Sequence, residues 1–153
     1  MNESISIRPI ARHDRDQWLP LWKGYNAFYG RHADTALPEA ITQATWEMFH
    51  HPDEPVHAHV ALDGELIVGL VHHVFHRSTT RLHDVCYLQD LFVTPSHRGR
   101  QIGRQLIEVV CACARDAGSS RVYWQTQIDN TSGRALYDKV ALHSGSIVYA
   151  HEL

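Results

Sequence analysis

Apolar and polar residues alternate at the start of the chain and then repeat at the spacing of a helix. Residues 5–10 (ISIRPI) alternate, which predicts an opening strand. Asp14 or Asp16 then stands where a helix cap is expected. A second helix is expected around residues 39–50, between Pro38 and two later prolines. The first helix is indicated by apolar residues three or four positions apart, namely Trp18, Leu21, Trp22, Tyr25 and Phe28.

The spacing then changes to that of strands. Residues 57–62 and 66–75 are expected to form an antiparallel hairpin, because the Asp-Gly pair at 63–64 is a strong turn signal. A third long strand covers Val85–Val93 and ends at the Thr-Pro pair that follows. The first half of the chain therefore predicts an antiparallel meander.

Beyond this strand, helices and strands alternate. A helix from about residue 102 to Gly118, a strand over 121–128, a helix over about 132–141 and a short last strand in SIVYAHE are expected. A strand–helix–strand crossover is right-handed and makes residues 85–93 and 122–127 parallel neighbours. The sequence therefore predicts one domain, residues 1–153. Its fold class is α/β, a mixed α+β sheet of antiparallel meander plus parallel central pair, with helices on both faces.

The composition is that of a globular protein and argues against several classes. The chain has 153 residues, of which 44% are hydrophobic and 20% charged. A net charge of −3 and an isoelectric point near 6.5 argue against a basic nucleic-acid-binding surface. No apolar run approaches the roughly 18 residues of a membrane helix, and the N-terminus does not have the order of a secretory signal. Three cysteines without framework spacing are typical of a reducing compartment, so a cytoplasmic location is expected.

A basic, glycine-containing turn precedes the helix near residue 102. Residues 96–106, SHRGRQIGRQL, hold three arginines and two glycines. The first amides of a helix have no partner inside it and carry partial positive charge, and glycines let an oxygen-rich ligand approach closely. The stretch is therefore predicted to hold a phosphate or pyrophosphate. It matches neither the P-loop pattern nor the glycine pattern of dinucleotide-binding folds.

Two segments resemble a known family. Residues 87–108, YLQDLFVTPSHRGRQIGRQLIE, are similar to the signature of the GNAT superfamily of acetyl-CoA-dependent N-acetyltransferases, where R/Q-x-x-G-x-G/A opens a helix after a strand. Residues 123–141, YWQTQIDNTSGRALYDKVA, resemble its later strand and helix, with an asparagine seven residues before a tyrosine. The expected element order also fits the GNAT fold. Similarity to spermidine/spermine acetyltransferases points to the small-amine or histone-type branch.

The resemblance implies a role for each matching residue. Backbone groups of Leu91, Phe92 and Val93 would pair with the pantetheine arm of acetyl-CoA, and Asn130 would also contact this arm. Tyr137 would act as general acid and protonate the leaving thiolate. The pyrophosphate would lie on amides of the basic turn, with Arg98 in the first position of the motif, followed by Gly99, Arg100, Gln101, Ile102, Gly103 and Arg104.

The chain departs from the family pattern at two positions. Gln101 replaces the first glycine of the motif, and we expect it in the first turn of the helix, with cofactor binding intact. Gln89 is a candidate catalytic residue where relatives commonly have a glutamate, but glutamine does not titrate. Asp90 follows it and faces the other way unless a bulge intervenes. The base is therefore left open between Asp90 and a histidine of the neighbouring strand, His72 or His73.

Thirteen histidines raise the question of a metal site. His72 and His76 share one strand face but lie about 13 Å apart at ~3.3 Å per residue, and His73 faces the other way. His57 and His59 are better spaced, but no third ligand is evident. No metal cofactor is predicted.

The predicted function is transfer of an acetyl group from acetyl-CoA, the cosubstrate, to a primary amine by direct attack in a ternary complex. The acceptor is left open between a polyamine, an amino acid and a protein or peptide amine, with Tyr25 and Tyr29 as candidates for its pocket wall. Neither a nucleic acid nor a membrane is an expected partner, and the resemblance implies a homodimer. Two alternatives remain: a non-catalytic acyl-CoA-binding sensor, favoured by Gln89, and an anion-binding interaction domain without a role for CoA.

Overall fold

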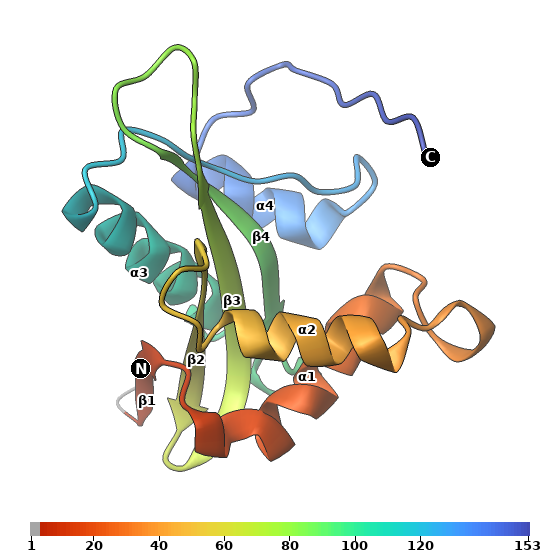
Figure 1. Ribbon diagram of the computed structural model, residues 1–153. Coiled ribbons are helices and arrows are strands. Elements are labelled where there is room, and N and C mark those ends of the chain that lie inside the picture. The colour runs from red at the N-terminus through yellow and green to blue at the C-terminus, as the bar shows by residue number, and fades with distance from the viewer. Residues whose placement is uncertain (1–3) are drawn as a thin grey trace.

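The computed structural model describes residues 4–153 and confirms the predicted mixed sheet (Figure 1). Within these described residues, five strands lie across the sheet in chain order, and all neighbours are antiparallel except β4 and β5, which are parallel. The sheet therefore combines the expected meander with the expected parallel pair. The strands are β1 (Ile5–Pro9), β2 (Val56–Asp63), β3 (Leu66–His76), β4 (Val85–Val93) and β5 (Val122–Tyr123).

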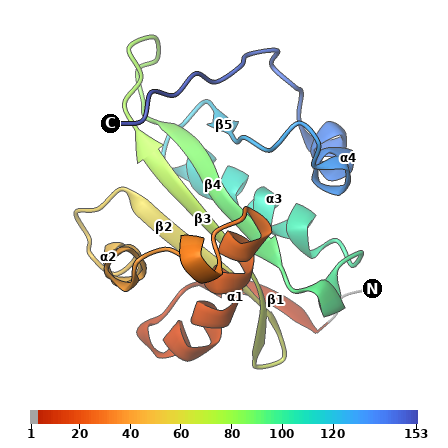
Figure 2. The same cartoon turned by 90° about the vertical axis from the view of Figure 1, so that its right-hand side faces the viewer.

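Helices cover both faces of the sheet (Figure 2). The helices α1 (Arg15–Phe28) and α2 (Glu39–Met48) pack on one face, and α3 (Ile102–Asp116) and α4 (Thr131–Val140) pack on the other. The core under α1 is aromatic and includes Trp18, Trp22 and Trp46. The core under α3 is aliphatic, and its centre is formed by Val71, Leu88, Leu106 and Val110. Burying such apolar surface is the main favourable contribution to folding.

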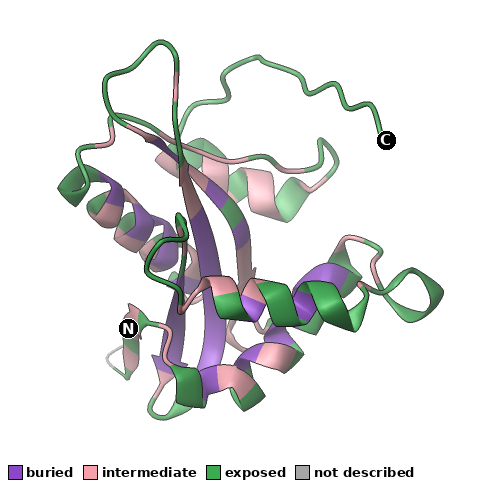
Figure 3. Ribbon diagram, in the orientation of Figure 1, coloured by how far each residue is buried: buried purple, intermediate pink, exposed green. Residues whose placement is uncertain are grey.

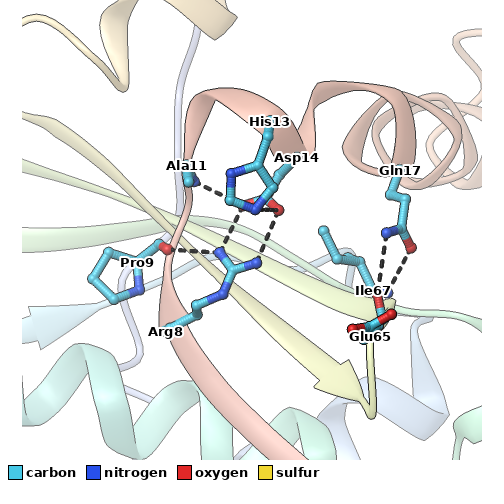
Figure 4. Close-up of polar contacts among 8 residues, drawn as sticks. All are labelled: Arg8, Pro9, Ala11, His13, Asp14, Gln17, Glu65 and Ile67. Carbon is cyan, nitrogen blue, oxygen red and sulfur yellow. Dashed lines mark hydrogen bonds and ion pairs between the residues drawn. The ribbon is translucent and has the colours of Figure 1, made fainter.

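Two sets of hydrogen bonds fix α1 to the sheet at its first turn (Figure 4). Arg8 of β1 donates two hydrogen bonds to Asp14, at 2.7 and 2.9 Å, and the Ala11 amide donates a third at 2.7 Å. Asp14 is only 2% exposed, and the bond from Arg8 holds the pKa of its carboxyl below the usual range. Gln17 then exchanges two hydrogen bonds with the backbone of the β2–β3 hairpin. The helix therefore has a defined position over the sheet.

Two predicted strands differ from the structure. The strand expected over residues 121–128 is limited to Val122–Tyr123, because the chain leaves β4 after Tyr123. The strand expected in SIVYAHE is absent, since residues 141–153 pair with none of the described strands and are exposed (Figure 3). Phe28, expected with the apolar face of α1, is 57% exposed. Within residues 4–153, no helix has the length and apolar character needed to cross a membrane.

Candidate active site

A β-bulge in β4 places an acidic side chain on the face covered by α1. His73 of β3 pairs with Leu88, and His72 pairs with Asp90, so Gln89 is an extra, exposed residue without a partner on β3. Side chains alternate between the faces of a strand, and one extra residue reverses the alternation beyond it. Asp90 therefore faces α1, as the sequence allowed only if a bulge was present.

Asp90 is the end of a buried chain of hydrogen bonds. The Trp18 indole Nε1 lies 3.1 Å from His72 Nε2, and His72 Nδ1 lies 2.9 Å from Asp90 Oδ2. Trp18 is fully buried, His72 is 2% exposed and Asp90 is 8% exposed. The three residues come from α1, β3 and β4, so the chain links the helix to the bulge.

Tyrosine hydroxyls lie near the Asp90 carboxylate. The Tyr25 hydroxyl of α1 donates a hydrogen bond to the Gln89 carbonyl at 3.3 Å. Burial, with the nearby Asp90 carboxylate, raises the pKa of Tyr25 well above its usual value. The same two causes raise the pKa of Tyr87 on β4. Both hydroxyls therefore stay protonated at neutral pH and can donate hydrogen bonds.

Tyr137 lies on α4 with its ring half-buried. It makes an edge contact with the Trp124 ring, at 5.6 Å between centroids. Burial, with a smaller effect of Tyr29, raises the pKa of Tyr137 to about 12. The phenol is therefore protonated at neutral pH, as a general acid must be.

One edge of β4 is free beside the bulge. β5 pairs only with Cys86 and Tyr87, so among the described residues the stretch from Leu88 to Val93 has no strand on that side. Two hollows border the end of α1 and share Phe28, although neither wall includes Asp90 or Tyr137. The larger, about 630 Å³, is lined by Phe28, Tyr29, Gln127, Asp129, Asn130, Thr131 and Ser132. The smaller, about 550 Å³, lies between α1 and the end of β4 and is lined mainly by apolar residues.

The basic turn differs from the prediction at Gln101. We expected this residue in the first helical turn, but its φ of 66° places it in the left-handed region, just before α3 begins at Ile102. A side chain in that conformation costs about 1–2 kcal/mol, which explains why the family pattern has glycine there. Gly99 also has a positive φ, 76°, and open surroundings. The amides of Gly103 and Arg104 lie in the first turn of α3, where no intrahelical acceptor exists.

The Arg98 side chain connects the basic turn to the end of β4. Its Nε donates to the Val93 carbonyl at 3.0 Å, and its guanidinium carbon lies 5.4 Å from the centroid of the Phe92 ring. The positive charge of the turn therefore lies beside the free edge of β4. The other two arginines of the turn lie near carboxylates, Arg100 at 4.0 Å from Asp63 and Arg104 at 3.3 Å from Glu108.

Asn130 caps α4. Its Oδ1 accepts a hydrogen bond from the Gly133 amide at 3.2 Å, and its Nδ2 donates to the Thr126 hydroxyl at 2.8 Å. The side chain packs so closely on Gly133 that a Cβ there would overlap it. Asn130 thus fixes the start of the helix that carries Tyr137, and it also lines the larger hollow.

The histidines divide between the two faces of the sheet. His73 faces α3, where its ring stacks on His57 and His59 at centroid distances of 5.2 and 5.8 Å. Buried nitrogens of His59 and His73 have no hydrogen-bond partner in the structure. Among residues 4–153, no group of three or more His, Cys, Asp or Glu side chains is arranged to hold a metal ion.

Sequence reasoning missed two residues of the site. Trp18 was predicted only as part of the apolar face of the first helix, and its indole N–H bond to His72 depends on how α1 crosses the sheet, which no local pattern specifies. Tyr87 was not singled out, although it lies on the same strand as Asp90. The aromatic spacing of α1 did indicate the helix face that covers the site.

A family model, Acetyltransferase (GNAT) family, matches residues 17–141 of the chain. The chain belongs to the GNAT family. It is 31% identical over 151 residues to the D-amino-acid N-acetyltransferase HPA3 of Saccharomyces cerevisiae, covering 97% of this chain and 91% of that protein. This GNAT protein is an acetyl-CoA-dependent N-acetyltransferase; the spermidine-type branch has no specific support.

Solved structures show the same fold. An aminoglycoside acetyltransferase from an uncultured soil metagenomic sample, in complex with trehalose, has a TM-score of 0.82 at 16% identity, covering 98% of this chain and 97% of that one. AAC(6')-Iy in complex with the bisubstrate analog CoA-S-monomethyl-acetylneamine has a TM-score of 0.80 at 16% identity, covering 97% and 98%. At such identities the likeness concerns the fold alone.

Replacing Gln101 with glycine should stabilise this GNAT domain. The substitution removes the strain of a left-handed side chain, partly offset by greater freedom of the unfolded chain, so we expect the free energy of unfolding to rise by about 0.5–1 kcal/mol. Urea unfolding measures the difference. The control is Gly99→Ala, which places a Cβ at φ 76° and should destabilise the domain. A loss of stability in Gln101→Gly would contradict the assignment of strain.

Proposed function

We propose that this N-acetyltransferase acetylates the α-amino group of free amino acids. The proposal rests on the Asp90 carboxylate, which the bulge of β4 sets beside the free edge of the same strand. A carboxylate attracts a cationic ammonium group, and the strand edge offers backbone groups to an acetyl donor. The name of the yeast relative, a D-amino-acid N-acetyltransferase, supports this acceptor class over polyamines and peptide amines.

Backbone groups bind the donor in this proposal. The pantetheine arm of acetyl-CoA pairs with Leu91, Phe92 and Val93 on the side of β4 that β5 leaves free. Arg98 releases the Val93 carbonyl as the arm pairs there, and its guanidinium then faces the phosphates. The pyrophosphate lies on the amides from Gly99 to Arg104, where the N-terminus of α3 favours an anion. Asn130, at the start of α4, lies along the arm.

The transfer then needs one base and one acid. Asp90 binds the substrate ammonium and takes one of its protons, which leaves a neutral amine. The amine nitrogen attacks the thioester carbonyl carbon; a C–N bond forms, the C–S bond breaks, and its electron pair goes to sulfur. Tyr137 gives its proton to the sulfur and regains one from the nitrogen. The net products are the N-acetyl amino acid, the CoA thiol and one proton, which leaves from Asp90.

The position of the bulge weakens the sensor alternative. Gln89 favoured a non-catalytic role because it replaces a titrating residue, but Gln89 is exposed at the bulge. Asp90 occupies the buried position beside Tyr25 in its place. The lack of a carboxylate at position 89 is therefore no obstacle to catalysis.

Arg31 provides a cation for the carboxylate of an amino acid. Its Nε donates to the buried Asn26 Oδ1 at 2.7 Å, which holds the side chain at the end of α1. The guanidinium carbon lies 6.0 Å from the ring of Tyr25, the tyrosine beside Asp90, and 5.7 Å from that of Tyr29. Arg31 and Asp90 thus both lie near Tyr25 and carry opposite charges, which fits an amino acid in its zwitterionic form.

The activity test measures release of the CoA thiol from acetyl-CoA with a panel of amines. The panel contains D- and L-amino acids, their carboxamides, polyamines, an aminoglycoside and basic peptides. We expect turnover with free amino acids. Turnover confined to polyamines, aminoglycosides or peptides would reject the acceptor class, and no turnover with any amine would reject the proposed reaction.

Tyr137→Phe should lower kcat by about 100-fold, the scale of a general acid, with the dissociation constant of acetyl-CoA unchanged. The phenol is removed while the ring and its contact with Trp124 remain. Steady-state kinetics and calorimetry measure the two quantities. Tyr123→Phe, which removes a hydroxyl bonded to His76 outside the site, is the matched control and should keep full activity. Unchanged kcat in Tyr137→Phe would eliminate Tyr137 as the acid.

Arg31→Gln should lower kcat/KM for a free amino acid by about 10-fold or more, because a charged hydrogen bond contributes about 1.5–3 kcal/mol. The carboxamide of the same amino acid should lose nothing, since it has no carboxylate. Arg121→Gln is the matched control, because Arg121 also stacks on a tyrosine, Tyr123, at 4.7 Å. An equal loss of kcat/KM for the amino acid and its carboxamide would show that Arg31 does not bind the carboxylate.

We also propose a homodimer, held by the C-terminal segment 141–153. This segment is extended and exposes a row of apolar side chains, which is unfavourable in water. β5 has an edge that no described strand covers, so the segment of one copy can extend the sheet of a second copy. A reducing, cytoplasmic location is also part of the proposal, because the three cysteines are free. The exposed residues are Leu142, Ile147, Val148, Tyr149 and Leu153.

A double substitution tests the dimer. Ile147→Asp with Tyr149→Asp places charges on the apolar segment and should convert a dimer into a monomer in light scattering after size-exclusion chromatography. The control replaces Ser144 and Ser146 of the same segment with aspartate and should stay dimeric. A monomeric unmodified chain, or a dimer that survives the double substitution, would refute this arrangement.

A further inference from the structure

Buried hydrogen bonds join Trp18, His72 and Asp90 beside the acceptor site, whose assignment rests on the proposed function. We infer that the Trp18 indole N–H holds His72 in its neutral Nδ1–H form, and that His72 in turn orients Asp90 as the carboxylate that receives the amine. Trp18 and His72 are thus positioning residues: they act through Asp90 and do not touch the substrate.

The identity of the donors fixes the direction of the chain. An indole nitrogen only donates, so His72 Nε2, 3.1 Å away, must be the acceptor. The ring proton of neutral His72 is then on Nδ1, from which it is donated to Asp90 Oδ2 at 2.9 Å. In the opposite tautomer, the Nε2–H of His72 would face the Trp18 N–H, and the Nδ1 lone pair would face the Asp90 carboxylate. Geometry alone therefore selects one tautomer.

The surroundings prevent the imidazole from adopting another arrangement. Trp22 of α1 lies 5.3 Å and Phe49, which follows α2, lies 4.6 Å from the His72 ring centroid. His72 is 2% exposed and Trp18 is fully buried, so water does not replace either hydrogen bond. A buried polar group that loses its partner is destabilised by about 1–3 kcal/mol, which keeps the chain intact.

The arrangement matters for the chemistry of Asp90. A neutral His72 orients the carboxylate without cancelling its negative charge, so the full charge is available to a substrate ammonium. Because Oδ2 accepts from His72, the proton taken from the amine goes to Oδ1. The same contact keeps Oδ2 in place as the charge of Asp90 changes, so the carboxyl does not have to reorient during turnover.

Trp18→Phe tests the inference, because it keeps an aromatic ring and removes the N–H. We expect kcat/KM for the amine to fall by about 10-fold, the effect of losing about 1.4 kcal/mol, with the KM for acetyl-CoA unchanged. The matched control is Trp46→Phe. Trp46 packs on Trp18 at 5.0 Å between ring centroids, and its other described ring contacts are with Phe49 and His50 rather than with His72. We expect this variant to keep its kcat/KM.

A spectroscopic measurement reads the tautomer directly. In ¹⁵N NMR of the histidine rings, His72 of the unmodified protein and of Trp46→Phe should show Nδ1 as the only protonated nitrogen. In Trp18→Phe, Nε2 no longer faces an N–H donor, so a ring protonated on both nitrogens and still bonded through Nδ1–H to Asp90 should become populated. An Nε2–H tautomer in the unmodified protein would overturn the inference, and so would an unchanged ring protonation and unchanged kcat/KM in Trp18→Phe.

Two His72 variants keep the test decisive if Trp18→Phe does not fold. His72→Asn retains an N–H that can reach Asp90 and should keep most of the kcat/KM for the amine, whereas His72→Leu should lose about 10-fold or more. Equal activity of the two variants would overturn the inference. The proposed function is judged separately, by turnover of the unmodified protein: if that fails, the NMR tautomer still decides whether Trp18 controls His72.

Discussion

The extra residue in β4 is the constraint on which the site depends. Without it, the alternation of side chains would turn Asp90 towards α3 and into the aliphatic core. With it, Asp90 bonds to His72 of the neighbouring strand β3 and lies beside Tyr25 of α1. The parallel pairing with β5 stops two residues before the bulge, so the carboxylate and the free strand edge lie next to each other. One irregularity thus brings together the groups that we propose to bind the acceptor and the donor.

The first helix is the second organising element, since it carries groups for orientation, hydrogen bonding and charge. Trp18 and Tyr25 lie on α1, and Arg31 lies just beyond its end, bonded back to Asn26 of the helix. Their position depends on the bond between Arg8 and Asp14 at the opposite end of the helix, which ties α1 to β1. A shift of the helix along its axis would move all three side chains relative to Asp90 together. The anchoring contact therefore supports the site from the opposite end of α1.

The sequence predicted the order of most elements, because hydrophobic spacing and turn residues are local signals. It also predicted the basic turn and the residues matching the family pattern, and the family is confirmed. The bulge was foreseen only as a condition, since it depends on the pairing of β4 with β3. The left-handed Gln101 was wrongly assigned, because its conformation follows from the path of the turn. The last strand was wrong for a related reason: the segment has strand-like spacing but pairs with no described strand of its own chain.

The stability of the fold depends on pH through the histidines on the α3 face of the sheet. Burial lowers the pKa of His73 from 6.5 to about 3, and it also lowers the pKa values of His57 and His59. The folded chain therefore binds fewer protons than the unfolded chain below pH 6.5. The free energy of unfolding is therefore not reduced by these groups above pH 6.5, and it decreases as the pH falls below 6.5, down to about pH 3 for His73. Three stacked imidazoles thus set an acid limit on the fold, apart from any role in acetyl transfer.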